Sequence, residues 1–114
     1  MIKIFHNPRC RKSREGLAYL EQKNVEFQIV DYLKEGLFKE DLKEILLKMQ
    51  KPVETLVRKQ EEIFKKELKG KSFNEDEWIQ IIFENPKLLQ RPLVVTKTKA
   101  IHAQPPELMD DILS

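Results

Sequence analysis

Within its first twenty residues the chain changes from the pattern of a β-strand to that of an α-helix. Residues 2–5 form a short, mainly apolar run that is typical of a strand, and Asn7-Pro8 is a turn pair that ends it. From Cys10 onward the apolar side chains recur at helical spacing, at Leu17 and Leu20. The segment therefore predicts a strand that leads into a helix, and it places the only cysteine of the chain where the two meet.

The position of Cys10 favours a reactive thiol. The free backbone N–H groups and the dipole at the start of a helix stabilise a thiolate and bring its pKa below the usual value of about 8.5. Arg9, Arg11, Lys12 and Arg14 flank Cys10, so the same loop can also hold an oxyanion. The alternative is a small buried thiol that only packs, which is common for free cysteines. Four basic residues so close to the cysteine favour the reactive thiol.

Composition narrows the class of protein. The chain has 114 residues, of which 40% are hydrophobic and 35% charged, and this predicts one globular domain over residues 1–114. Its net charge of +2 argues against a nucleic-acid partner. We see no apolar run long enough to cross a membrane and no signal peptide, so a cytoplasmic protein is expected. One cysteine and two histidines argue against a metal site and exclude an internal disulfide.

The middle of the chain predicts the next strand and then a series of helices. A second strand is expected over residues 25–30, which completes a β-α-β unit, and residues 31–36 are expected to be a connection. Apolar spacing predicts helices over residues 37–49 and 53–57. The highly charged stretch 61–72 is expected to be a partly helical surface segment.

The last forty residues predict one more helix, a hairpin and a final helix. Asn74 and Glu77 have the spacing of a capping box for the first of these, and Asn85-Pro86 ends it. The remaining elements are a strand, a hairpin turn, a return strand and a last helix, expected over residues 93–96, 97–99, 100–103 and 107–113. The fold class is therefore α/β with a mixed sheet, in the order β-α-β, helical insertion, β-β-α.

Pro92 stands directly before the apolar run 93–96. Proline cannot donate a hydrogen bond to a central ladder, so it must lie at the start of that strand, and the bond between Arg91 and Pro92 can be cis. A proline in this place, together with a cysteine that caps a helix, fits the thioredoxin-like plan.

Three segments resemble the glutaredoxin-coupled arsenate reductase family, whose fold is shared by the Spx-like transcriptional regulators. They are residues 6–14, residues 56–59, and the stretch from Asn85-Pro86 to Arg91-Pro92 and the valines after it. The order and spacing agree over essentially the whole chain. Each segment alone is a weak signal, whereas the combination is quite specific.

The resemblance implies a role for each matching residue. Cys10 would be the nucleophile that attacks arsenate, Arg58 and Arg91 would contact the oxyanion, and Pro92 would be the cis proline beside the site. His6 and Ser13 would tune the thiolate. Because no second cysteine is present, the resemblance also implies an external thiol, glutathione followed by glutaredoxin, with no bound cofactor. A monomer is expected.

One position departs from the family. Its reductases carry a third arginine in an Arg-Pro pair shortly before the last helix, and the aligned pair here is Gln104-Pro105. With Arg11 and Lys12, Gln104 completes the predicted oxyanion-binding set, but its amide brings no charge. Lys97 or Lys99 can compensate only if the hairpin turn that carries them faces the site.

Each of these residues also has a simpler explanation. Arg58 and Arg91 can be surface arginines or members of structural salt bridges. His6 can merely satisfy backbone groups in the turn, and Ser13 can be an ordinary first-turn serine. His102 is interpreted as a hairpin residue without a role, and Trp78 as a core residue.

Two other functions remain open. One is a regulator that contacts RNA polymerase, similar to the Spx-like proteins, although oxidation sensors of that group commonly have a second cysteine where Ser13 stands. The other is a thiol enzyme that acts on a different small substrate, such as a glutathione conjugate, and Gln104 is the feature that favours it.

Overall fold

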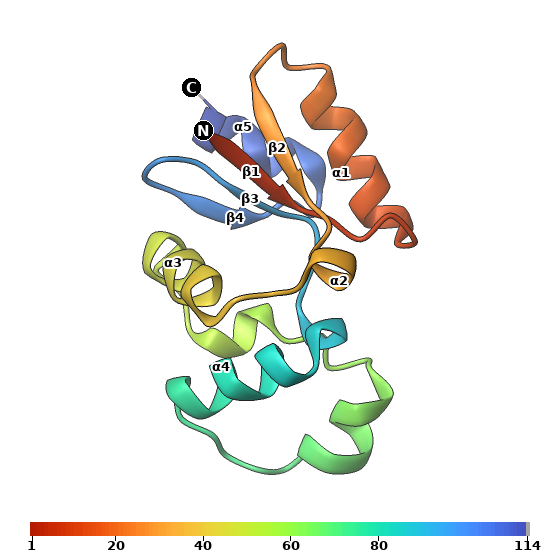
Figure 1. The fold of residues 1–114 in the computed structure, drawn as a ribbon, viewed down its shortest axis with the longest axis vertical. Coiled ribbons are helices and arrows are strands. Elements are labelled where there is room, and N and C mark those ends of the chain that lie inside the picture. Colours follow the sequence, from red (N-terminus) through yellow and green to blue (C-terminus); the bar gives the residue numbers. More distant parts are fainter. Residues whose placement is uncertain (114) are drawn as a thin grey trace.

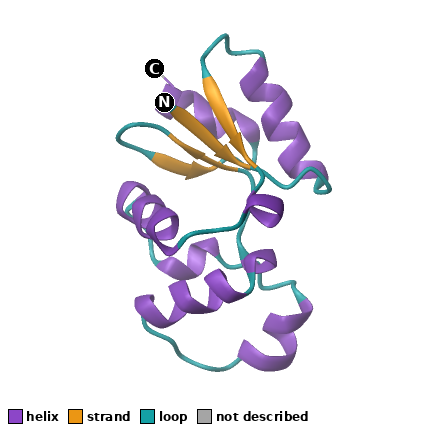
Figure 2. Ribbon diagram, viewed as in Figure 1, coloured by secondary structure: helices purple, strands orange, loops and turns teal. Residues whose placement is uncertain are grey.

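The computed structural model describes residues 1–113, which are built on a four-stranded mixed sheet (Figures 1 and 2). Its strands lie in the order β2-β1-β3-β4, with β1 at Ile2–Phe5, β2 at Phe27–Val30, β3 at Leu93–Val95 and β4 at Ala100–His102. Strands β1 and β2 are parallel, whereas β3 is antiparallel to both β1 and β4. The predicted fold class, two parallel strands followed by a hairpin, is confirmed.

Helices surround this sheet and fill the long connection between β2 and β3 (Figure 1). The α-helices are α1 (Arg11–Glu21), α2 (Tyr32–Glu35), α3 (Lys39–Met49), α4 (Glu75–Glu84) and α5 (Asp110–Leu113). The 3₁₀ turns are Val53–Leu56, Pro86–Leu88 and Pro106–Met109, and one π-helical turn is Phe64–Leu68. No helix among residues 1–113 combines the length and apolar character that a membrane span requires.

Apolar side chains of the strands alternate between the two faces of the sheet, and each face is covered by a buried cluster. Ile4 packs in a cluster with Leu20 of α1 and Met109 near α5, whereas its neighbour Phe5 belongs to the larger cluster on the opposite face. That larger cluster joins the sheet to α3, α4 and the turns between them, and it contains Trp78, which is the predicted core residue. Side chains of successive strand residues point to opposite faces, which explains this division.

Helix α4, in the insertion between β2 and β3, begins and ends where the sequence predicts. The Asn74 side chain accepts a hydrogen bond of 2.8 Å from the Glu77 N–H, and Glu77 Oε1 accepts one of 2.9 Å from the Asn74 N–H. The predicted capping box is therefore confirmed. The same helix, α4, ends at Glu84, directly before Asn85-Pro86.

Several predicted elements differ from the structure, and the helix predicted over residues 37–49 begins only at Lys39. The second strand begins at Phe27 instead of residue 25, because Asn24 has a positive φ of 55° and the chain reaches the edge of β1 only after that turn. Residues 31–36 are not only a connection, since they contain α2 with a fully buried Tyr32. The predicted last helix over 107–113 is divided into the turn Pro106–Met109 and α5.

Candidate active site

The loop before α1 is folded by the backbone and side chain of Asn7. Its Oδ1 accepts a hydrogen bond of 3.0 Å from the Arg9 N–H, and its carbonyl accepts one of 3.0 Å from the Cys10 N–H. Cys10 then takes an extended conformation and caps α1, and its own carbonyl accepts from the Arg14 N–H at 3.0 Å. The thiol therefore lies at the positive end of the helix and remains partly exposed.

The surroundings of Cys10 favour the thiolate. Burial raises the pKa of the Cys10 thiol, but the combined effect of its neighbours outweighs that and lowers the pKa below its ordinary value. These neighbours are the backbone N–H groups of Ser13 and Lys12, which act as hydrogen-bond donors, and the Arg91 side chain, which acts through both hydrogen bonding and charge. The effect of the helix start was expected from the sequence, whereas the charge that acts on the thiol comes from Arg91 and not from the flanking Arg9, Arg11 or Arg14.

A short stretch of β-bridge brings the two predicted arginines to the same place. Val57 pairs antiparallel with Leu89, and the bridge is flanked by hydrogen bonds from Arg58 N to Leu88 O (2.7 Å) and from Gln90 N to Leu56 O (2.8 Å). Arg58 and Arg91 follow the two bridged residues closely in sequence. Figure 1 shows this part of the chain beside α2, between the sheet and the helical insertion.

The guanidinium groups of both arginines are only partly satisfied. Arg58 Nη1 lies 3.0 Å from Glu61 Oε2, and Arg91 Nη1 donates to the carbonyls of Lys87 (3.0 Å) and Leu89 (3.4 Å). Arg91 Nε is nevertheless buried without a hydrogen-bond partner among residues 1–113, and Arg58 Nη1 is buried with only its ion pair to Glu61. A buried donor without an acceptor costs about 1–3 kcal/mol, and an oxyanion bound here would supply acceptors.

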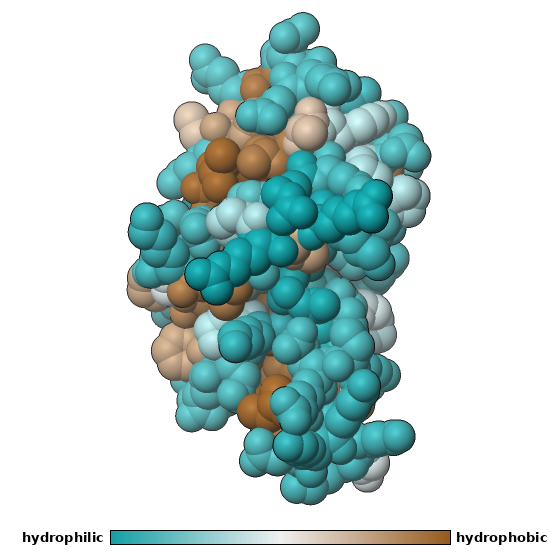
Figure 3. Space-filling model, turned by 90° about the vertical axis from the view of Figure 1, so that its right-hand side faces the viewer, coloured by the Kyte–Doolittle hydropathy of each residue, from teal (hydrophilic) through white to brown (hydrophobic). Residues whose placement is uncertain are grey.

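These groups share one small cavity with the thiol. It has a volume of about 220 Å³ and is lined by Cys10, Arg11, Lys12, Arg58, Gln60, Gln90, Arg91 and His102. No lining residue is acidic, so the cavity suits a small anion. Figure 3 shows the face that carries the start of α1, where the most hydrophilic side chains gather across the middle.

Four of the predicted site residues do not line this cavity. His6 and Ser13 are buried beneath the loop, with His6 Nδ1 and Ser13 Oγ 2.7 Å apart, and Ser13 Oγ also accepts from the Asn7 N–H at 3.0 Å. Ser13, which the resemblance implies would tune the thiolate, acts on Cys10 through its backbone N–H, while its hydroxyl is taken up by His6 and Asn7. Burial lowers the pKa of His6 more than Asp31 and Ser13 raise it.

Pro92 and Gln104 complete that group of four. The Arg91-Pro92 peptide bond is cis, as the resemblance implies, and the Gln104-Pro105 bond is cis as well. Gln104 Oε1 is buried without a hydrogen-bond partner among residues 1–113, and the side chain lies outside the cavity wall. Lys97 and Lys99 also lie outside it, in a hairpin turn closed by hydrogen bonds between Thr96 and Lys99.

Four residues at the site were not predicted to have a role there. Gln60, Gln90 and His102 line the cavity. Gln60 directly follows the segment 56–59, and Gln90 lies within the stretch that ends at Arg91-Pro92, so the sequence did carry a signal for both. Tyr32 is fully buried behind the arginines, and its hydroxyl donates to the Leu89 carbonyl at 3.5 Å. Burial raises the pKa of Tyr32 to about 12, although Arg91 and Arg58 act in the opposite direction.

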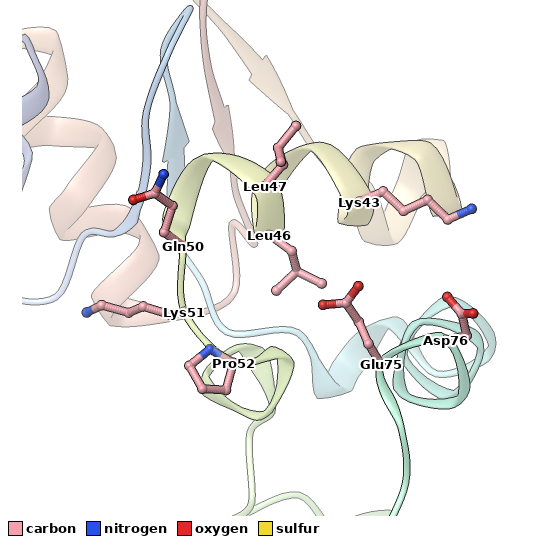
Figure 4. A pocket seen from close by; sticks show the side chains of 8 residues that line it. All are labelled: Lys43, Leu46, Leu47, Gln50, Lys51, Pro52, Glu75 and Asp76. Atoms are coloured by element: carbon pink, nitrogen blue, oxygen red, sulfur yellow. The ribbon is translucent and has the colours of Figure 1, made fainter.

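A second, wider cavity lies between α3 and the start of α4 (Figure 4). It has a volume of about 640 Å³, and it is lined by Lys43, Leu46, Leu47, Gln50, Lys51, Pro52, Glu75 and Asp76. Figure 4 shows Leu46 and Glu75 pointing into the gap between the helices and Lys43 pointing away from it. Because its wall carries no cysteine or histidine and mixes both signs of charge, this cavity lacks the reactive groups found around Cys10.

Replacing each arginine in turn separates their effects on the thiol. Arg91 lowers the pKa of Cys10, whereas Arg58 is not among the groups that shift it. We therefore expect Arg91→Gln to move the midpoint of Cys10 alkylation to higher pH and Arg58→Gln to leave it unchanged. The measurement is the rate of alkylation by iodoacetamide from pH 5 to 10. Equal midpoints for the two variants would contradict the assignment.

The chain is similar to known proteins over nearly its whole length. The ArsC family matches residues 5–112. The uncharacterised protein YfgD of Escherichia coli K12 is 40% identical over 98% of this chain and 96% of its own, and an arsenate reductase of Neisseria meningitidis serogroup A is 33% identical over 98% and 97%. A solved structure, the arsenate reductase from Vibrio cholerae, superposes with a TM-score of 0.91 at 37% identity over 98% and 97% of the two chains. The chain has a thioredoxin-like fold and belongs to the ArsC family.

Proposed function

We propose that this protein is a cytoplasmic, monomeric arsenate reductase that works with a single thiol. Cys10 attacks arsenate, Arg58 and Arg91 bind its oxygens with Arg11 and Lys12 nearby, and glutathione and glutaredoxin complete the reduction. The observation that carries the proposal is the cavity in which Cys10, Arg58 and Arg91 meet. Relatives named arsenate reductase at full-length coverage support the same reaction.

The first step follows from the state of the thiol. The Cys10 thiolate sulfur forms a bond to arsenic, and the bond from arsenic to one hydroxyl group of the arsenate breaks. The displaced hydroxyl takes up a proton from solvent, equivalent to the one that the thiol lost, and leaves as water. Arginine binds the remaining oxygens well because its planar fork matches two oxygens of one anion. The donors available for this contact are the unpartnered Arg91 Nε and the Arg58 guanidinium, whose Nη1 is ion-paired with Glu61.

The remaining steps need thiols from outside the chain. Overall, one arsenate and two thiols give one arsenite, one disulfide and one water, with arsenic gaining the two electrons that the thiols lose. Cys10 is the only cysteine, so it cannot be resolved from within the chain. The proposal therefore includes glutathione as co-substrate and no bound cofactor.

The direct test is turnover. The protein is mixed with arsenate, glutathione, glutaredoxin and a system that recycles the disulfide, and the arsenite formed is quantified. We expect arsenite to accumulate well beyond one equivalent per protein. Arsenite at the level of a mixture without the protein would overturn the proposal.

A second candidate is a thiol enzyme that acts on another small substrate, such as a glutathione conjugate. It is favoured by Gln104, which stands in place of an arginine and lies outside the cavity wall. Its signature is protection of Cys10 from alkylation by the conjugate but not by arsenate. Protection by arsenate alone would exclude it.

A further inference from the structure

The side chain of His102 is fixed at the cavity in one orientation. His102 lines the same cavity as Cys10, although it lies on β4, far from Cys10 in sequence. Its Nε2 is 3.2 Å from the Arg91 carbonyl oxygen. A carbonyl oxygen can only accept a hydrogen bond, so Nε2 carries the proton. In the neutral ring the other nitrogen, Nδ1, therefore has a free lone pair.

The groups around His102 keep its imidazole neutral. Burial lowers its pKa most, and Lys12 of α1 and Arg58 of the helical insertion lower it further, whereas the bond to the Arg91 carbonyl raises it. The net result is a pKa below the ordinary value of about 6.5. Cys10, Arg11 and the Arg91 side chain are the other ionisable groups in the cavity wall, which contains no carboxylate.

The cavity otherwise offers hydrogen-bond donors and very weak bases. Arginine and lysine at neutral pH only donate, and the amide oxygens of Gln60 and Gln90 do not take up protons in water. Once Cys10 is bonded to arsenic, its sulfur no longer acts as a base. Among the residues that line the cavity, this leaves His102 Nδ1 as the group able to accept a proton.

We propose that His102 is a further catalytic residue, the general base for the thiol that attacks the arsenic bound to Cys10. This inference rests on the proposed function and names a step within it. A low-molecular-weight thiol such as glutathione is largely protonated at neutral pH, so its attack requires removal of a proton. A histidine with a pKa near or below neutrality is suited to that task.

The step is balanced without any further reactant. The sulfur of the second thiol forms a bond to arsenic, and one arsenic–oxygen bond breaks. The thiol proton passes to His102 Nδ1 and then to the departing oxygen, which leaves as water. No electrons are transferred here, because the reduction of arsenic follows when the next thiol forms a disulfide with the one just bound.

Two variants separate this role from a structural one. The amide nitrogen of glutamine can take the place of Nε2 and keep the hydrogen bond to the Arg91 carbonyl, but glutamine is not a base. His102→Gln thus removes only the base, whereas His102→Ala removes both the base and the hydrogen bond. Two properties are measured for each protein: protection of Cys10 from alkylation by arsenate, and arsenite formed in a single turnover with glutathione from pH 5.5 to 8.5.

We expect both variants to keep arsenate protection within about threefold of the wild type and to lose roughly 100-fold in the single-turnover rate, a typical contribution of a general base. The loss should shrink when glutathione is replaced by trifluoroethanethiol, a thiol acidic enough to be largely ionised at pH 8. The wild-type rate should fall as His102 is protonated at acidic pH, and this dependence should disappear in His102→Gln.

Each other outcome has a definite meaning. A wild-type rate in His102→Gln, with a loss only in His102→Ala, would make His102 a structural residue and overturn the inference. An equal loss of arsenate protection in both variants would place His102 in substrate binding and also overturn it. If the wild type neither binds arsenate nor forms arsenite, the proposed function itself fails, and the inference fails with it.

Discussion

Replacing Cys10 with serine should lower arsenite formation by roughly 10³-fold or more, to the level of a mixture without protein. Serine keeps nearly the same volume, but its hydroxyl is not ionised at neutral pH and is a far weaker nucleophile. The donors that stabilise the thiolate, Arg91 and the backbone N–H groups of Ser13 and Lys12, cannot compensate for that difference. The measurement is the turnover assay with glutathione and glutaredoxin.

The fold should not change in this variant, which makes the test specific. Cys10 occupies the N-cap of α1 without a side-chain capping bond, and serine is a preferred residue at this position. The free energy of unfolding of Cys10→Ser should therefore equal that of the wild type or exceed it by up to about 1 kcal/mol. Turnover that survives in a folded Cys10→Ser protein would contradict the role of the thiol.

The second large effect is expected at Gly16, where α1 packs against the cis proline. A Cβ added at Gly16 would lie 2.5 Å from Cγ of Pro92 and 3.4 Å from its Cβ, and a proline ring cannot swing away. Gly16→Val should therefore lower the free energy of unfolding by about 2–3 kcal/mol, near the upper end for overpacked cores. Urea unfolding measures this change.

The matched control is Ala18→Val, on the exposed side of the same helix. It introduces the same side chain at the modest cost of a β-branched residue in a helix, about 0.5 kcal/mol, and it meets no proline. Because Pro92 follows Arg91 directly, Gly16→Val should also raise the pKa of Cys10, whereas Ala18→Val should not. Equal unfolding free energies for the two variants would show that the contact with Pro92 is unimportant.

The positions of Cys10 and Pro92 relative to the nearest helix or strand could be predicted from the sequence, because they depend only on neighbouring residues. A strand, a turn and a helix in immediate succession placed Cys10 at a helix start, and a proline before an apolar run placed Pro92 at the start of a strand. The cavity that joins Cys10, Arg58 and Arg91 was expected through the resemblance, since no periodicity relates residues so far apart.

The parts that depend on tertiary contacts could not be predicted. His102 was interpreted as a hairpin residue without a role, because only the pairing of β4 with β3 brings it to the Arg91 carbonyl. Helical spacing placed Ser13 one turn after Cys10 but could not show that its hydroxyl would be buried against His6 and Asn7. Tyr32 was hidden in a predicted connection, since a four-residue helix is too short to show a periodicity.

The most direct test of a reactive thiol in an oxyanion site is the rate of Cys10 alkylation as a function of pH, with and without arsenate. A lowered pKa means that the rate rises and reaches its plateau at a lower pH than for a free thiol. We predict that arsenate slows the reaction across this range and that Arg58→Gln or Arg91→Gln weakens the protection. A midpoint equal to that of a free thiol, with no protection by arsenate, would contradict the account.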